Sequence, residues 1–385
     1  MKSRHGDFAP VILRMEKMAQ GGESIAHLED GRVCFVAGAL TGETAEVVVD
    51  QEKKDYAKGF ATEILESSPF RVKPRCPFYG KCGGCSLQHA DFDFQLSMHR
   101  ASVEELFRRF AKTELPENWK IHSGRAFGYR NRVRLVRAEG GFGFRMSRSH
   151  RPIPVSRCEI LSAALNEALT EKFFPDVPEI SAFDNGSGKI SFHYRGMDAS
   201  MFQKYATNSV SIGNNVLSMD AACFFQSNLE LLPELVETVR NAAGSGKYLI
   251  DLYSGVGFFA SLLRENFERI VTVEREPGAL RHAKRNVPGA KNVSAPAEEW
   301  LLRNDASGAD VLIVDPPRTG LLPSALEAIA KANPKKLLYV SCDPATLARD
   351  FRKFSDRGYE IRNAEGFAFY PQTPHFEMFL ELCRG

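Results

Sequence analysis

The stretch that decides the fold is Tyr248–Gly257, YLIDLYSGVG, in which an apolar strand runs directly into a glycine turn. Three later segments repeat this arrangement: IVTVERE at 270–276, VLIVDPP at 311–317 and LLYVSCD at 337–343. Each ends in a turn and is followed by a helical pattern, and strands that alternate with helices indicate a parallel sheet covered on both faces. We therefore predict a doubly wound, Rossmann-like α/β domain over residues 216–385, with a terminal antiparallel hairpin.

The residues before this domain have a different sequence pattern. Residues 10–65 are short runs of alternating apolar residues separated by glycine turns, which predicts a small OB-fold-like β-barrel domain over residues 5–66. A linker-like stretch, SSPFRVKPR at 67–75, follows it. The remaining residues, 72–215, combine a cysteine-rich loop, a helical stretch and arginine-rich strands, and we predict a central α+β domain there.

Composition narrows the class of protein. The chain has 385 residues, of which 43% are hydrophobic and 25% charged, values typical of a folded protein and not of a disordered one. No apolar run approaches the roughly 18 residues that cross a bilayer, and the start, MKSRHGDFAP, lacks the apolar stretch of a signal peptide. Eight cysteines are too few for a secreted disulfide scaffold of this length. We expect a cytoplasmic protein with no membrane contact and no obligate protein partner.

Three cysteines lie within ten residues, in Cys76-Pro-Phe-Tyr-Gly-Lys-Cys82-Gly-Gly-Cys85. The Gly-Gly turn lets the backbone wrap around an inorganic centre, and Cys158 is the natural candidate for a fourth ligand. Four cysteines can hold zinc or an iron–sulfur cluster. Zinc sites usually pair two CxxC knuckles, so three clustered ligands and one distant ligand favour the iron–sulfur cluster, in a structural role. Unligated buried cysteines remain the other alternative.

Positive charge is concentrated between Arg125 and Arg157. This segment holds nine arginines, no lysine and one acid, Glu139, so its net charge is +8 although the whole chain carries only +2. A solvated face is the simplest interpretation of a charge run. However, the arginines alternate with aromatic residues, and guanidinium groups suit phosphates while aromatic faces stack on bases. The pattern therefore favours a nucleic-acid surface.

The glycine turn Gly255-Val-Gly257 lets a ligand approach the backbone at the carboxyl end of the first strand. Glu274 ends the next strand, where a carboxylate can accept hydrogen bonds from both hydroxyls of a ribose. The third glycine of the dinucleotide fingerprint is absent, although a nicotinamide enzyme stays open as an alternative. The DLxxGxG pattern with this acid resembles the class I S-adenosylmethionine-dependent methyltransferases.

Two further strand ends carry candidate catalytic groups. Asp315-Pro-Pro-Arg318 forms a rigid turn, and Ser341-Cys342-Asp343 brings a thiol to the same edge of the sheet. C5 of uracil is a poor nucleophile, and a thiolate that adds at C6 activates it toward a methyl group. A base must then remove the C5 proton, and Glu377 on the terminal hairpin is the candidate. A buried strand-end cysteine and a solvated glutamate are the alternatives for Cys342 and Glu377.

Together these motifs resemble the RNA uracil-C5 methyltransferases over nearly the whole chain. GGESIAHLEDGRVCFVAGALTGE at 21–43 is similar to a TRAM-type RNA-binding domain, and GYRNRVRL at 128–135 and FFQSN at 224–228 match family stretches. The resemblance implies a [4Fe–4S] cluster on Cys76, Cys82, Cys85 and Cys158, with Cys342 as nucleophile and Glu377 as general base. It also implies a cofactor site for S-adenosylmethionine built from Gln226, Tyr253, Gly255, Gly257, Glu274 and Asp315. The chain departs from the family pattern at Phe258, where asparagine is usual, and at 295–297, which lack the polar residue expected near the adenine.

We therefore expect an RNA-binding enzyme that converts a uridine of structured RNA, with 23S rRNA favoured, to 5-methyluridine. Phe224 and Phe225 are expected to stack on the extruded base. Ribosomal RNA is favoured because the minimal transfer-RNA enzymes of the family lack the barrel and the cluster, and a tRNA uridine-54 C5 methyltransferase is the alternative. An amino or small-molecule methyltransferase and a non-catalytic RNA-binding iron–sulfur protein are further alternatives. Arg318 argues against the cytosine-C5 enzymes, which place a cysteine in that motif.

Overall fold

The computed structural model describes residues 10–170 and 173–385, and these form two compact units. Unit 1 comprises residues 10–102 together with 145–151 and 371–374. Unit 2 comprises 103–144, 152–370 and 375–385. Residues 72–215, expected as one central domain, thus contribute to both units, and residues 5–9 of the expected barrel lie outside the described part. None of the described helices is long and apolar enough to cross a membrane.

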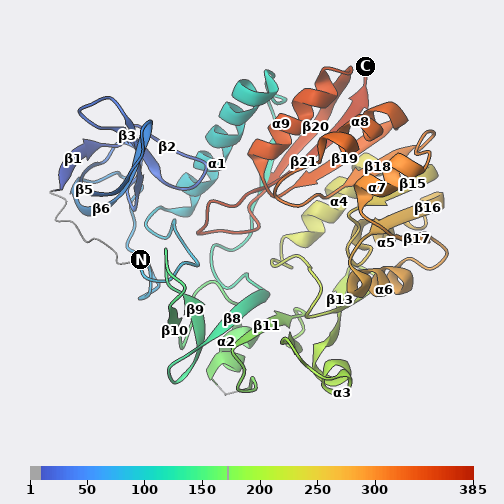
Figure 1. Cartoon of the computed structure of the whole chain (residues 1–385), viewed down its shortest axis with the longest axis horizontal. Coiled ribbons are helices and arrows are strands. Elements are labelled where there is room, and N and C mark those ends of the chain that lie inside the picture. The colour runs from blue at the N-terminus through green and yellow to red at the C-terminus, as the bar shows by residue number, and fades with distance from the viewer. Residues whose placement is uncertain (1–9, 171–172) are drawn as a thin grey trace. The chain divides into compact units, whose positions relative to one another are not determined.

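Unit 1 is built around a six-stranded, mainly antiparallel sheet with the strand order β1-β5-β6-β4-β3-β2 (Figure 1). Its longest strands, β5 and β6, alternate buried and more exposed residues, as expected when one face packs on a core. That core contains Met15, Val36 and Val47, each at most 1% exposed. The strands are β1 (Val11–Arg14), β2 (Lys17–Met18), β3 (Ser24–His27), β4 (Val33–Ala37), β5 (Thr44–Glu52) and β6 (Tyr56–Glu66).

Helix α1 (Phe92–Leu106) begins in unit 1 and continues into unit 2 as the π-helical turn η1 (Phe107–Ala111), which packs against α9. Unit 2 then contains a five-stranded sheet, ordered β10-β9-β8-β11-β12, and the hairpin β13-β14. These elements are β8 (Arg132–Ala138), β9 (Gly141–Arg145), β10 (Pro152–Pro154), α2 (Ala163–Thr170), β11 (Glu179–Asp184), β12 (Ile190–His193), α3 (Ala199–Met201), η2 (Phe202–Ala206), β13 (Thr207–Ile212) and β14 (Asn215–Asp220).

The second sheet of unit 2 has eight strands in the order β17-β16-β15-β18-β19-β21-β20-β7. The first five strands are parallel, and β21 then joins β19 and β20 in antiparallel pairing. The doubly wound sheet and its terminal hairpin are therefore confirmed. The strands are β7 (Lys120–His122), β15 (Gly246–Leu252), β16 (Phe267–Glu274), β17 (Lys291–Ser294), β18 (Val311–Val314), β19 (Lys336–Ser341), β20 (Tyr359–Phe367) and β21 (Glu377–Arg384).

Helices cover both faces of this sheet (Figure 1). Helix α5 packs between α4 and α6, while α8 packs between α7 and α9. The central strand β18, VLIV, is apolar and buried along its whole length because helices cover both faces of the sheet. The helices are α4 (Leu232–Ala243), α5 (Phe258–Leu263), α6 (Pro277–Asn286), α7 (Ala297–Arg303), α8 (Pro323–Ala332) and α9 (Pro344–Ser355).

Strand β7 was not foreseen. It extends the catalytic-domain sheet with three residues from the segment that the sequence assigns to the central domain, and it pairs in parallel with β20. His122 explains its position, since Nε2 lies 2.6 Å from the Glu365 carboxylate and the ring stacks on Phe367.

Candidate active site

A cavity of about 750 Å³ lies in unit 2 at the carboxyl ends of the parallel strands. It is lined by residues that follow β15, β16, β18 and β19 and by the segment after β14. Open α/β sheets bind their ligands at this edge. The lining includes five of the six predicted cofactor residues and both predicted catalytic residues: Gln226, Tyr253, Gly255, Glu274, Asp315, Cys342 and Glu377.

The sixth predicted cofactor residue, Gly257, is not part of the lining. It has φ = +79° at the start of α5, a conformation that favours glycine. A Cβ there would lie 2.9 Å from the Val287 Cγ2 atom and 3.2 Å from the Ala283 Cα atom. Gly257 thus allows α5 to begin close to α6.

Glu274 is held rigidly at the end of β16. Its Oε2 accepts a hydrogen bond from the Gly255 amide at 2.8 Å, and its Oε1 accepts one from the Glu276 amide at 2.7 Å. Each carboxylate oxygen has a second lone pair for a further donor. Tyr253 lies beside it with φ = +59°, and its hydroxyl donates to Glu298 at 2.8 Å. Glu298 is on α7, so an acid near the 295–297 departure is present after all.

The register of the strands brings Cys342 and Glu377 together. Ser341, the last residue of β19, pairs with Met378 of β21, so Cys342, which follows Ser341, and Glu377, which precedes Met378, lie at the same end of these strands and line the same cavity. Helix α9 starts directly after Cys342, because the Asp343 side chain accepts from the Ala345 and Thr346 amides and Pro344 fixes the first turn. The cysteine is thus placed between a fixed strand and a capped helix.

The protonation of this group is set by burial. Burial raises the pKa of both Asp315 and Glu377, and the charge of Asp315 raises the pKa of Glu377 further, which Arg318 partly opposes. Burial, followed by the charges of Glu377 and Asp315, raises the pKa of the Cys342 thiol to about 11, which Arg318 partly opposes. The Glu377 Oε2 atom is buried with no hydrogen-bond partner among the described residues. The resting site therefore holds a neutral thiol beside carboxyl groups that keep a proton more readily than usual.

The segment 220–228 forms another wall of the cavity, and two family-like stretches meet there. The Asn131 amide donates to the Ser227 carbonyl at 2.7 Å, and an Arg132 guanidinium Nη2 donates to the Ala221 carbonyl at 3.3 Å. The Gln226 Oε1 atom is buried and unpartnered within the described part of the chain. Its side chain is only 5% exposed.

The two phenylalanines in this segment have different environments. Phe224 lines the cavity and is 66% exposed, so its face is available to a ligand. Phe225 is 3% exposed and packs edge-to-face against Phe183 and Phe258. The expectation that both stack on a base is therefore wrong for Phe225, which belongs to the core. Phe258 forms part of the same aromatic cluster.

Sequence reasoning missed several lining residues. Asp220, Cys223 and Arg281 lie at one end of the cavity, and Tyr370 and His375 lie near Cys342. An Arg318 Nη2 atom is 3.3 Å from His375 Nε2. Of these residues, only Asp220 could have been recognised from the sequence, because an aspartate before a turn often accepts hydrogen bonds from the backbone amides that follow it. Asp220 does so with the Ala222 and Cys223 amides.

The four predicted cluster cysteines are all partly buried. In unit 1 the loop of Cys82 is fixed to residues 145–147, since the Gly83 amide donates to the Arg145 carbonyl at 3.0 Å. The Gly84 amide donates to the Cys82 Sγ atom at 3.4 Å. In unit 2 the Cys158 backbone is clamped by Asn166, which accepts from its amide at 2.8 Å and donates to its carbonyl at 3.0 Å.

Acidic residues from elsewhere in the chain offset much of the positive charge of the arginine-rich segment. Five of its arginines form ion pairs with acids outside the segment: Arg125 with Glu230, Arg134 with Glu179, Arg137 with Asp176, Arg148 with Asp50 and Arg157 with Glu159. Surface pairs of this kind contribute about 0–1 kcal/mol, so a phosphate can replace the acid. Arg132 differs, because it is largely buried and supports the 220–228 segment.

Comparisons with known proteins agree with this geometry. A sequence profile of the tRNA (Uracil-5-)-methyltransferase family matches residues 303–384, and a TRAM domain profile matches residues 3–62. The solved structure of a Pyrococcus abyssi tRNA (uracil-54, C5)-methyltransferase in complex with S-adenosyl-L-homocysteine has the same fold. Its TM-score is 0.73 at 22% identity, and the match covers 97% of this chain and 100% of that one.

Two relatives match along almost their whole length. An RNA methyltransferase of Aquifex aeolicus is 30% identical, over 96% of this chain and 97% of its own. The 23S rRNA (uracil(1939)-C(5))-methyltransferase of Shewanella amazonensis is 28% identical, over 95% of this chain and 94% of its own. Because similarity at this level spans the whole chain and includes the segment with Cys342 and Glu377, the protein belongs to the RNA uracil-C5 methyltransferase family.

Proposed function

We propose that the unit 2 cavity transfers a methyl group from S-adenosylmethionine to C5 of a uridine in ribosomal RNA. The observation that carries this proposal is that Cys342, directly after β19, and Glu377, at the start of the neighbouring strand β21, line one cavity together with Glu274. A thiol and a carboxyl group at one strand edge are what addition at C6 and proton removal at C5 require.

The residues present fit the methyl donor. The cavity has both a rigid carboxylate, Glu274, suited to a ribose, and buried polar atoms on Gln226 and Glu377 that lack partners among the described residues. S-adenosylmethionine, when bound, supplies an electrophilic methyl group. Glu274, Tyr253 and Gly255 would hold its nucleoside part, and Asp315 would lie near its positive charge.

The chain's own residues account for the remaining steps. The uridine must leave its stack, at a cost of a few kcal/mol, and Phe224 offers an exposed aromatic face to receive it. Cys342 must lose its proton before it can add to C6, and Arg318 is the cation that favours the thiolate. After methylation, a deprotonated Glu377 removes the C5 proton, and the sulfur leaves C6.

Ribosomal RNA is the proposed substrate because a relative that matches over nearly the full length acts on 23S rRNA. A transfer RNA is the second candidate, supported by the fold it shares with a tRNA enzyme. The decisive experiment measures 5-methyluridine by mass spectrometry, site by site, in rRNA and tRNA from cells with and without the gene. One rRNA position should lose the modification and regain it with the wild-type gene but not with Cys342→Ala. Loss from tRNA alone would contradict the rRNA proposal, and no loss from either would contradict the function.

We also propose that Cys76, Cys82, Cys85 and Cys158 bind a [4Fe–4S] cluster. The hydrogen bond from the Gly84 amide to the Cys82 sulfur supports it, because amide donors stabilise cluster sulfurs. Anaerobically purified protein should be brown and contain about four irons per chain. Cys82→Ser should lose iron and thermal stability, whereas Cys383→Ser, a control on β21, should keep both. Stoichiometric zinc without iron would contradict the cluster.

A further inference from the structure

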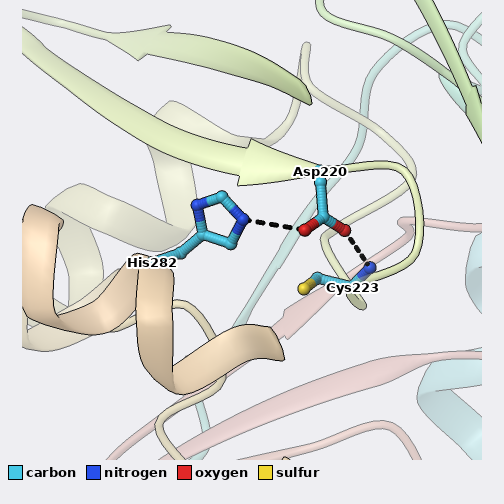
Figure 2. A group of neighbouring side chains, drawn as sticks. All are labelled: Asp220, Cys223 and His282. Carbon is cyan, nitrogen blue, oxygen red and sulfur yellow. Dashed lines mark hydrogen bonds and ion pairs between the residues drawn. The ribbon is translucent and has the colours of Figure 1, made fainter. Parts of the chain in front are cut away.

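The side chains of Asp220, Cys223 and His282 converge on one another (Figure 2), and Asp220 and Cys223 also line the cavity. Asp220 ends β14, Cys223 follows three residues later, and His282 is on α6, more than 50 residues away in the sequence. All three side chains are buried, with exposed fractions of 1%, 8% and 3%. Their potential ligand atoms lie within 4.8 Å of one another.

Hydrogen bonds hold these side chains in place. The Asp220 Oδ1 atom accepts from the Ala222 and Cys223 amides, both at 2.9 Å, which turns Oδ2 toward His282 Nε2, 2.9 Å away. On the far side of the ring, the Ser218 hydroxyl is 2.9 Å from Nδ1. The arrangement is therefore fixed before any ligand arrives.

We propose that Asp220, Cys223 and His282 form a binding site for a divalent cation of the zinc class. Carboxylate oxygen, imidazole nitrogen and thiolate sulfur together are the donor set that zinc prefers. Asp220 and Cys223 also line the cavity, which gives the ion a route of entry and an open fourth position for water. To admit a tetrahedral ion about 2.1 Å from both Oδ2 and Nε2, those two atoms need to separate by only roughly 0.5 Å.

The protonation changes that metal binding requires at His282 and Cys223 can be accommodated at this site. The ion replaces the Nε2 proton, and a neutral ring then carries its proton on Nδ1. The Ser218 hydroxyl serves both forms, because it donates to a bare Nδ1 and accepts from Nδ1–H. The Cys223 thiol gives its proton to solvent. A second partner of this kind on a metal-bound histidine is the usual arrangement in zinc sites.

Two arginines lie nearby and must be accommodated. Arg281 reaches to 4.0 Å from Asp220 Oδ2, but its side chain is 64% exposed and can move into solvent. Arg132 interacts electrostatically with both Cys223 and Asp220, and its Nη1 atom is buried without a partner among the described residues. A metal-bound thiolate on Cys223 would supply the anionic acceptor that this donor lacks.

Occupancy has a local consequence. Asp220 and Cys223 begin the segment that presents Phe224 and Gln226 to the cavity. An ion that links this segment to α6 would restrict its motion. Hydrogen exchange of residues 221–228 should therefore slow when zinc is added.

The test uses Co²⁺ as a spectroscopic probe in the full-length, metal-depleted protein, because cobalt bound to thiolate absorbs visibly. Wild-type protein should show one saturable cobalt site per chain that Cys223→Ser lacks, on top of any cobalt held by other cysteines. His282→Gln keeps a side-chain donor for Asp220 but should weaken binding by at least about 100-fold. Ser218→Ala, which removes no ligand, should weaken it by about 10–100-fold.

The matched control is Cys383→Ser, which should bind cobalt like wild type. Thermal melts of the metal-free variants establish that each is folded, and if Cys223→Ser is not, His282→Gln and Ser218→Ala decide the matter. Equal cobalt spectra and affinities in wild type, Cys223→Ser and His282→Gln would overturn the proposal. So would the absence of any cobalt or zinc binding that depends on Cys223.

Discussion

At the scale of single residues, the active site combines groups that oppose each other's ionisation. Burial raises the pKa of both Asp315 and Glu377, the charge of Asp315 raises the pKa of Glu377 further, and both carboxylates disfavour the thiolate of Cys342. A bound cation would relieve this conflict, since a positive charge stabilises carboxylates and thiolate alike. The positive charge of a sulfonium ligand would therefore favour the ionised forms of all three groups.

Glu377→Gln should separate the two halves of the reaction. Cys342 acts before methyl transfer and Glu377 only after it, so the variant should add, methylate and then stall with RNA attached through Cys342. A denaturation-resistant protein–RNA band should accumulate with S-adenosylmethionine on a gel, and it should be absent in the Cys342→Ala double variant. Full turnover by Cys342→Ala would rule out the covalent mechanism.

The same substitution should change stability in a pH-dependent way. The pKa of Glu377 is raised by burial, so above the ordinary carboxyl pKa the folded state holds more protons than the unfolded state. Stability then falls as pH rises through that window. Glu377→Gln removes this penalty, and its Tm advantage over wild type should grow from about pH 5 to about pH 8. An advantage that shrinks over this range would show that the carboxyl group is not destabilised by burial.

At the scale of elements, the junctions between strands and helices place the reactive groups. Asp343 caps α9 and follows Cys342 directly, so replacing Asp343 should affect both the stability of the helix and the position of the cysteine. Asp343→Ala should cost about 0.5–2 kcal/mol in denaturant unfolding. Asp343→Asn, which keeps the capping oxygen, should recover most of it. If both variants lose equal stability, the charge of Asp343 and not its cap is what matters.

The same scale shows what the sequence can predict. The parallel strands are recognisable because each of β15, β18 and β19 contains an apolar run, YLI, VLIV and LLYV, that ends at a polar motif. That Cys342 and Glu377 line the same cavity was also predictable in outline, since a returning hairpin reaches the same edge. By contrast, three-residue β7 has no signal of its own, because the contacts of His122 with Glu365 and Phe367 determine its place. The group of Asp220 and His282 depends likewise on α6 packing against β14.

At the scale of the whole molecule, folding brings acidic residues next to an arginine-rich segment that has almost none in its own sequence. The net charge of the arginine-rich segment is largely offset by acids that folding brings to it, as with Arg134 and Glu179. Sequence reasoning had no means of finding these partners, which lie up to about a hundred residues away. The arginines thus fall into two groups. Exposed arginines such as Arg134 pair with acids that an RNA phosphate can replace, whereas Arg132 hydrogen-bonds to the backbone and stabilises the fold.

That division can be tested with two matched substitutions. The Arg134 side chain is 72% exposed, so a phosphate can replace Glu179, and Arg134→Ala should weaken RNA binding and flatten its dependence on salt by roughly 0.7–0.9 in log–log slope. Arg132 instead holds the Ala221 carbonyl, so Arg132→Ala should leave the slope unchanged and lower kcat by disturbing the segment that bears Gln226. Fluorescence anisotropy at several salt concentrations, combined with single-turnover methylation rates, measures both quantities. A slope that changes with Arg132→Ala but not with Arg134→Ala would reverse the assignment, and it would make the buried arginine the phosphate contact.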